Sequence, residues 1–117
     1  MHDYRKLKVW KRAHALVLGI YKVTERYPGT QLRGLISQSQ RSAASIAANL
    51  VEGAGAQSDP EFRRFFGYAV SSSLELEYPL LLAHDLGYLD GATSVVMTSE
   101  LGEIRGMLLG LRASLSK

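Results

Sequence analysis

The fold of this chain is decided by residues 32–52, LRGLISQSQRSAASIAANLVE. Wound at about 100° per residue, the stretch forms a helix that is buried along one side. A second face has almost no bulk and consists of Ser37, Ala44 and Ala48. A third face carries a polar stripe of Gln38, Arg41, Ser45, Asn49 and Glu52, and the alternative interpretation of this stripe is the solvated back of the helix. A helix with such faces suits a position with neighbours on more than one side, as in a helical bundle or at a subunit contact. The apolar face consists of Leu32, Leu35, Ile36, Ala43, Ile46, Ala47 and Leu50.

Length and composition bound the class of protein. The 117 residues suffice for one domain, residues 1–117, that buries a core without metal or disulfide staples. The absence of cysteine excludes disulfides, thiolate metal sites and cysteine nucleophiles, and it fits a reducing compartment. No apolar segment follows the charged amino terminus MHDYRKLKVWKR, and uncharged runs stop at about half the length that a bilayer needs. We therefore expect a cytoplasmic protein without membrane contact.

The net charge of +3 hides an asymmetry along the chain. Up to Arg41 there are nine Lys and Arg against two Asp and Glu, a balance of +7. From Ser42 onward five basic residues face nine acidic ones, a balance of −4. The first part therefore predicts an anionic partner or an acidic surface of another copy.

The first predicted helix covers residues 7–26 and ends at Tyr27-Pro28-Gly29. Its outer face holds a basic stripe within roughly 100° of arc, with Ala15 and Gly19 between the cations. Such a stripe suits a phosphate backbone, although a solvated helix back is the alternative. The stripe consists of Lys8, Lys11, Arg12, Lys22 and Arg26. The residues expected to face the core are Trp10, Ala13, Leu16, Val17, Ile20, Tyr21 and Thr24.

Two further helices follow the central one, which we extend to residues 31–53. Ser58-Asp59-Pro60-Glu61 is a capping box with a proline in the first turn, so a helix starts at Ser58 and ends near Gly87. Pro79 lies inside it and predicts a kink or a local 3₁₀ turn at residues 75–79. The last helix carries a coiled-coil-like seam with alternating spacings of four and three. The seam consists of Met97, Leu101, Ile104, Leu108, Leu111 and Leu115.

Glycines recur every four residues on another face of the last helix, at Gly102, Gly106 and Gly110. Each costs about 1 kcal/mol of helix propensity relative to alanine. We expect close approach of another helix, from a second subunit, to offset this cost. The alternative is that the glycines are tolerated on a face of the helix that is exposed to solvent. Short breaks between long helices make sequential helices antiparallel neighbours. The fold class is therefore all-α, an antiparallel up-down-up-down four-helix bundle.

Several separated blocks lie in order along roughly residues 4–112, namely YRKLKVWK at residues 4–11, GLISQ at 34–38, SIAAN at 45–49 with Glu52-Gly53, SLELE at 73–77 and LGYL at 86–89. Together these blocks resemble one known family. It comprises the four-helix-bundle proteins encoded in intervening sequences of bacterial 23S ribosomal RNA genes. The family is similar in fold to the accessory variability protein of diversity-generating retroelements, a basic homopentamer that binds a reverse transcriptase and nucleic acid. The resemblance therefore implies a ring-forming homo-oligomer, with a pentamer favoured, that binds RNA or DNA, but it transfers no activity.

The sequence departs from the family pattern at two places. Pro79 stands where a residue other than proline is expected, and Ala54-Gly55-Ala56 stands where basic residues are usual. The second departure weakens any phosphate contact by that loop.

The sequence gives little support for a catalytic site or a metal site. None of the three histidines follows a glutamate by three positions, as a di-iron bundle requires. We expect no cofactor, no metal and no enzyme. The leading hypothesis is a homo-oligomer that binds nucleic acid; the alternative is a protein-protein assembly module without nucleic acid. The predicted phosphate contacts are Lys8, Lys11, Arg12, Lys22, Arg26, Arg33 and Arg41, and the predicted subunit interface is Gly102, Gly106, Gly110, Ala44 and Ala48.

Overall fold

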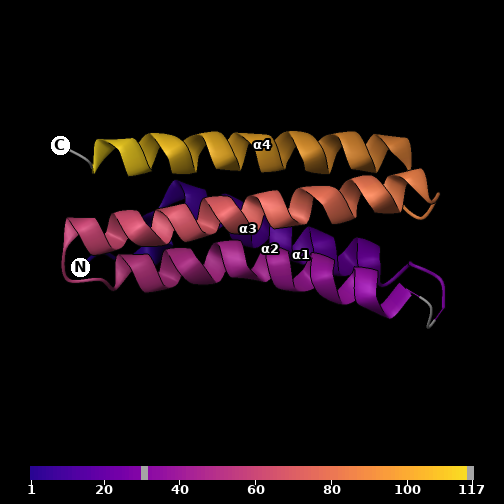
Figure 1. Ribbon diagram of the computed structural model, residues 1–117, viewed down its shortest axis with the longest axis horizontal. Coiled ribbons are helices and arrows are strands. Elements are labelled where there is room, and N and C mark those ends of the chain that lie inside the picture. The colour runs from indigo at the N-terminus through magenta and orange to yellow at the C-terminus, as the bar shows by residue number, and fades with distance from the viewer. Residues whose placement is uncertain (30–31, 116–117) are drawn as a thin grey trace.

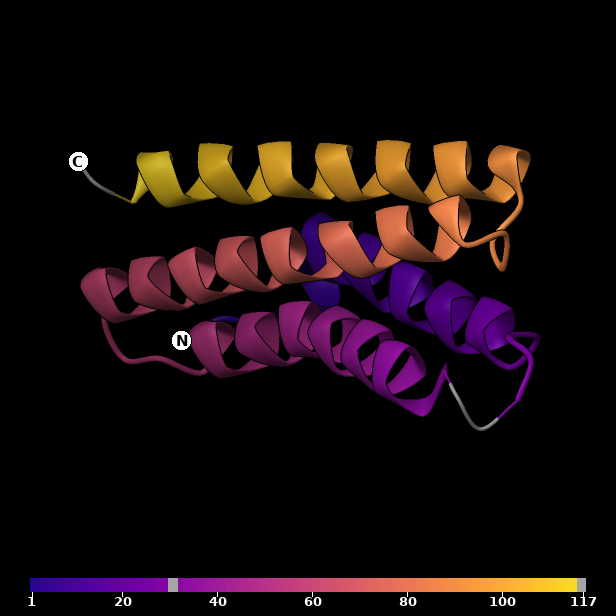
Figure 2. The ribbon, with the colours of Figure 1, turned by 45° about the vertical axis from the view of Figure 1, so that its right-hand side comes forward.

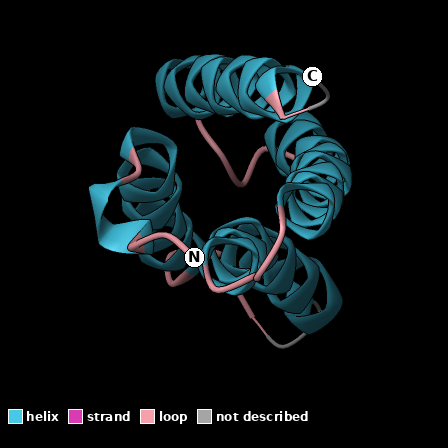
Figure 3. Cartoon of the chain, turned by 90° about the vertical axis from the view of Figure 1, so that its left-hand side faces the viewer, coloured by secondary structure: helices cyan, strands magenta, loops and turns pink. Residues whose placement is uncertain are grey.

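The computed structural model describes residues 1–29 and 32–115, and all regular structure within them is helical. The predicted all-α, antiparallel up-down-up-down four-helix bundle is confirmed, with successive helices running in opposite directions (Figure 1). Viewed along the bundle, the helices follow one another around a common centre in chain order (Figure 3), which places α2 and α4 on opposite sides. The elements are η1 (Tyr4–Lys6), α1 (Lys8–Thr24), α2 (Arg33–Ala54), α3 (Asp59–Asp85) and α4 (Gly91–Ser114).

The core lies where the apolar faces of the four helices meet. The seam predicted for the last helix is confirmed, since its first four residues are buried and Leu111 and Leu115 pack against them half-buried. Among helices that are neighbours around the bundle, contact is most extensive between α2 and α3 and least extensive between α1 and α4. The largest fully buried apolar side chains are Ile20, Ile46, Leu50, Phe66, Leu76, Leu80, Leu101, Ile104 and Leu108.

Three expectations about the helices are corrected. The first helix is shorter than predicted, Lys8–Thr24 instead of 7–26, and the start at Gln31 lies outside the described residues. Tyr21 was expected in the core but is 42% exposed. Of the two alternatives predicted at Pro79, the local 3₁₀ turn is absent, since residues 75–79 are all α-helical and the buried proline lies within the helix. A kink at this position stays a prediction.

Local hydrogen bonds and a glycine set the two ends of α3. The Ser58 hydroxyl accepts a hydrogen bond from the backbone N–H of Glu61 at 3.3 Å, which confirms the predicted start of α3. At the other end Gly87 adopts φ +85°, a conformation that glycine accepts at little cost. The Tyr88 N–H then donates to the Ala83 carbonyl at 2.9 Å and closes the last turn.

A close approach between α2 and α3 depends on Gly53. A Cβ at this position would lie 2.8 Å from Phe65 Cβ and 3.0 Å from Phe62 Cδ1. The chain reverses nearby, with the α2–α3 connection at the left of Figure 2. The amino terminus is tied to the same end, because the His2 N–H donates to the Ala54 carbonyl at 2.6 Å. Within the described ranges, no helix has an apolar stretch long enough to cross a membrane.

Candidate nucleic-acid interface

The outer surface of α1 carries most of the predicted phosphate contacts. Lys8, Lys11 and Lys22 are exposed on the helix, and Arg26 is exposed just beyond its end. None of these four side chains forms an ion pair within residues 1–29 and 32–115. Helical spacing places the three lysines on one side of α1. The three lysines can therefore meet an external anion without first losing an internal partner, whereas Arg26 lies near enough to Asp90 for its charge to contribute to the lowered pKa of that carboxyl.

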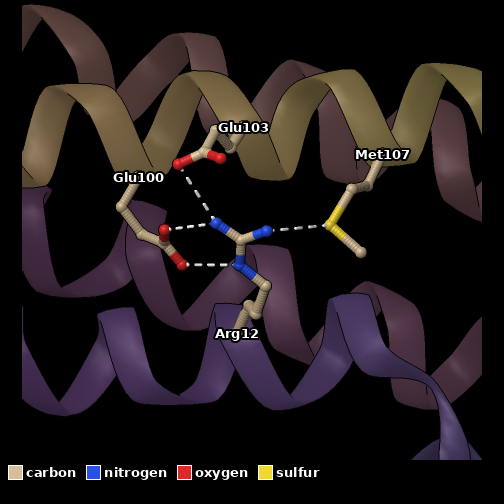
Figure 4. A network of polar contacts seen from close by, with 4 residues as sticks. All are labelled: Arg12, Glu100, Glu103 and Met107. Carbon is tan, nitrogen blue, oxygen red and sulfur yellow. Dashed lines mark hydrogen bonds and ion pairs between the residues drawn. The ribbon is translucent and has the colours of Figure 1, made fainter.

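Arg12 differs from its neighbours on the stripe because its guanidinium is bound by α4 (Figure 4). Nε donates to Glu100 Oε2 at 2.9 Å and Nη2 to Glu100 Oε1 at 2.5 Å, a bidentate pair. Nη2 also lies 3.2 Å from Glu103 Oε2, and Nη1 donates to Met107 Sδ at 3.5 Å. The hydrogen bonding that Arg12 donates to the Glu100 carboxylate is the main cause of a raised pKa of Arg12. Arg12 therefore links α1 to α4, and an external phosphate must compete with two carboxylates for it.

The two predicted contacts on α2 are separated from each other. Arg33 is the first residue of α2, and its side chain is exposed at the end of the helix that follows the connection from α1. Arg41 is exposed in a groove between α2 and α3, which also includes Gln38, Ser42 and Glu75. The structure thus places Arg41 on the α3 side of α2, away from the stripe on α1.

The polar stripe of α2 lies partly within the seam between α2 and α3 instead of on a solvated back. Ser45 Oγ and Ser72 Oγ are 2.8 Å apart. Asn49 Nδ2 donates to the Ser45 carbonyl at 2.8 Å and to Ser45 Oγ at 3.1 Å. These bonds satisfy polar groups between two helices, so they explain part of the stripe without a ligand.

The structure also brings together cations that the sequence analysis did not select. Arg105 joins α4 to α3, with Nε donating to Ser73 Oγ at 2.8 Å and Nη2 lying 2.8 Å from Glu77 Oε1. Arg63, Arg64 and Arg112 line a shallow depression beside Pro60, where α3 begins and α4 ends. The charge count hid this group, because the chain from Ser42 onward is acidic in total. In the sequence, the adjacent pair Arg63-Arg64 was the signal that could have indicated this group of cations.

The residues predicted for the subunit interface lie on two separate faces. Space is open beyond a Cβ built at Gly102, Gly106 or Gly110, and all three positions are exposed. On α2, Ala48 is exposed and Ala44 is half-buried. Among the described residues α2 and α4 do not contact each other, so the two predicted faces do not meet within one chain.

Residues with metal-binding chemistry do not gather in the described part of the chain. No group of three or more histidine, aspartate or glutamate side chains is placed there to hold a metal ion.

The architecture and the exposed cations define an all-helical, antiparallel four-helix-bundle protein with a basic first helix. The chain belongs to the 23S rRNA-intervening sequence protein family, whose model matches residues 5–110. A crystal structure of a protein of unknown function from the S23 ribosomal protein family of Bacteroides thetaiotaomicron has the same fold, with a TM-score of 0.82 at 24% identity. The match covers 89% of this chain and 97% of that one. No curated protein matches the sequence.

Proposed function

We propose that this protein is a non-catalytic homo-oligomer that binds RNA or DNA through the basic surface of α1. The observation that carries the proposal is the set of four exposed cations, Lys8, Lys11, Lys22 and Arg26, which lack ion pairs among the described residues. Closely spaced cations gain affinity for a phosphate backbone by releasing its condensed counterions. Arg33 extends the surface, whereas Arg12 contributes less because Glu100 and Glu103 already neutralise it.

The test is filter binding of the full chain to a structured RNA and to a duplex DNA across a series of salt concentrations. The proposal expects the logarithm of the association constant to fall linearly with the logarithm of salt, by about 0.9 per phosphate contact on duplex DNA. Affinity that is absent at low salt, or that does not change with salt, contradicts the proposal.

The oligomer is proposed to form through the glycine face of α4 and the small-residue face of α2. These faces lie on opposite sides of the bundle, an arrangement that suits head-to-tail contacts between successive copies. Head-to-tail contacts close into a ring when the rotation between copies permits it, and five subunits are what the family resemblance implies.

A protein-protein assembly module without nucleic acid is the second candidate. It is favoured by an exposed apolar stripe on α3, where Leu74, Tyr78 and Leu81 are 53%, 62% and 53% exposed. Their spacing of four and three places them on one side of the helix. Recovery of a partner from nuclease-treated lysate favours this candidate, whereas loss of the partner after nuclease favours nucleic-acid binding.

A further inference from the structure

Two exposed rings lie beside the basic surface of α1. Tyr21, which the sequence placed in the core, is 42% exposed, and His14 is exposed on the same helix. The two residues are seven positions apart, so helical geometry places them about 20° apart around α1 and about 10 Å apart along it. Lys11 and Lys22 lie within roughly 100° of both rings on the same geometry. Exposed rings and exposed cations therefore share the outer side of α1.

His14 is the last ring of a stack that begins at the amino terminus. Its imidazole is parallel to the Trp10 indole, with centroids 5.0 Å apart and an interplanar angle of 5°. Tyr4 contacts Trp10 edge-on, with centroids 4.8 Å apart. Trp10 is half-buried, so the stack is held against the bundle while His14 stays exposed. Among the residues that the structure describes, no other ring contacts His14 and none contacts Tyr21, so both can take a further planar group.

The charges around α1 determine on which side of the lysines a bound strand can place its bases. On the side toward α4, Glu100 and Glu103 hold Arg12 and present carboxylates to any approaching phosphate (Figure 4). α1 itself contains no acidic residue, and Glu25 follows its last residue. A strand with its phosphates on the lysines therefore turns away from α4, which is toward the two exposed rings.

We propose that α1 binds single-stranded nucleic acid, with phosphates on Lys8, Lys11 and Lys22 and unpaired bases stacked on His14 and Tyr21. This inference rests on the proposed function and names the class of nucleic acid. Because the rings are about 10 Å apart along the helix, each takes a separate base. A duplex keeps its bases stacked on one another, so it can use the lysines only. Stacking accepts every base, since each has a π-face, and it therefore confers no strong sequence preference.

The strand and a neighbouring subunit use different helices. The proposed subunit contacts are the glycine face of α4 and the small-residue face of α2, which lie on opposite sides of the bundle (Figure 3). Around the common centre α1 lies between these two helices and carries neither face. Binding of a strand to α1 is therefore compatible with assembly.

The experiment measures fluorescence anisotropy of a labelled oligouridylate, a labelled oligothymidylate and a labelled duplex DNA of equal length, each titrated with the full chain. Wild type is expected to bind both single strands more tightly than the duplex. The double variant His14→Ala with Tyr21→Ala is expected to weaken single-strand binding by at least about fivefold for each ring and to leave duplex binding unchanged. The loss is expected to be similar for RNA and DNA, because stacking engages the base and not the sugar.

Two matched controls accompany the double variant. Tyr78→Ala removes a ring of α3 that is 62% exposed, and it is expected to change neither affinity. Tyr21→Phe keeps the ring and is expected to retain the single-strand affinity of wild type. A double variant that binds single strands as tightly as wild type, or that loses duplex affinity to the same degree, overturns the inference.

Failure of this inference is distinguishable from failure of the proposed function. Equal affinity of wild type for single strands and duplex, together with a lower salt slope in a Lys8→Gln, Lys11→Gln, Lys22→Gln variant, overturns stacking and leaves phosphate binding by α1 intact. Absence of wild-type binding to all three probes overturns both.

A second measurement uses wild type and applies where the double variant does not fold. An oligouridylate that carries one 5-iodouridine is irradiated in complex with the full chain, and the cross-linked residues are mapped by mass spectrometry. Cross-links at His14 or Tyr21 support stacking, because the excited base reacts with a ring that lies next to it. Cross-links at neither residue overturn it.

Discussion

At the scale of single residues, neighbouring cations on one helix have different surroundings. Lys8 and Arg12 are one helical turn apart on α1, yet only Arg12 reaches a carboxylate on α4. The sequence could predict the stripe, because helical spacing is local. It could not predict the pairing, since Glu100 is 88 positions away and its approach depends on how α4 packs beside α1.

This difference predicts opposite effects for two matched substitutions. Lys8→Gln is expected to lower the salt slope of nucleic-acid binding by up to about 0.9 and to leave the melting temperature nearly unchanged. Arg12→Gln is expected to lower the melting temperature, because Glu100 and Glu103 lose the cation between them, while changing the slope less. Anisotropy titrations and thermal melts of both variants check this, and equal slope changes contradict our interpretation of Arg12.

Two glycines in helices provide a second matched pair. Gly53→Ala is expected to destabilise the protein by roughly 1 kcal/mol, because a Cβ at 2.8 Å from Phe65 Cβ forces side chains apart and outweighs the gain in helix propensity. Gly102→Ala meets open space and is expected to stabilise the helix by about 0.5–1 kcal/mol. Urea unfolding of the two variants measures both effects. Stabilisation by Gly53→Ala would contradict the close approach of α2 and α3.

At the scale of the helices, most of the correct predictions came from patterns among residues that are close together in the chain. Ser58 caps α3 and the spacing from Met97 to Leu108 buries one side of α4, as predicted, because both depend on neighbours along the chain. Pro79 shows the limit of local reasoning, since α3 stays α-helical through a residue that lacks the N–H for its intrahelical bond, and the proline is buried in the core. Tyr21 shows the same limit, because the arc that the neighbouring helices cover decides its exposure.

The cap of α3 gives a prediction at this scale. Ser58→Ala removes the acceptor for the Glu61 N–H and is expected to cost about 1 kcal/mol of unfolding free energy. Ser71→Ala is the control, because Ser71 is exposed in the interior of the same helix and alanine there has the better propensity. Denaturant unfolding compares the two, and an equal response indicates that Ser58 does not act as the cap.

At the scale of the whole molecule, apolar and small residues remain on the outside of the bundle. The stripe of Leu74, Tyr78 and Leu81 lies on α3, next to the helix that carries the open glycines. The sequence could predict the glycine repeat but not that the two small-residue faces lie on opposite sides, because that follows from the order of helices around the centre. Small-residue faces on opposite sides are what the proposed head-to-tail assembly requires.

Assembly through the glycine face predicts a change of mass for one substitution. Gly106→Leu places a large side chain where the backbone of α4 is open, and it is expected to lower the mass of the assembly measured by light scattering. The control is Gly55→Ala, at an exposed position beyond the end of α2. An unchanged mass for Gly106→Leu clears this face of a role in assembly.

The claim on which the proposed function depends is that the exposed cations of α1 bind phosphates. The most direct measurement compares wild type with a variant that carries Lys8→Gln, Lys11→Gln, Lys22→Gln and Arg26→Gln, in duplex-DNA binding across salt concentrations. We predict a wild-type affinity that falls steeply with salt and a slope lower by up to about 3.6 in the variant. Equal slopes for the two proteins, or no binding by wild type at low salt, would contradict the claim.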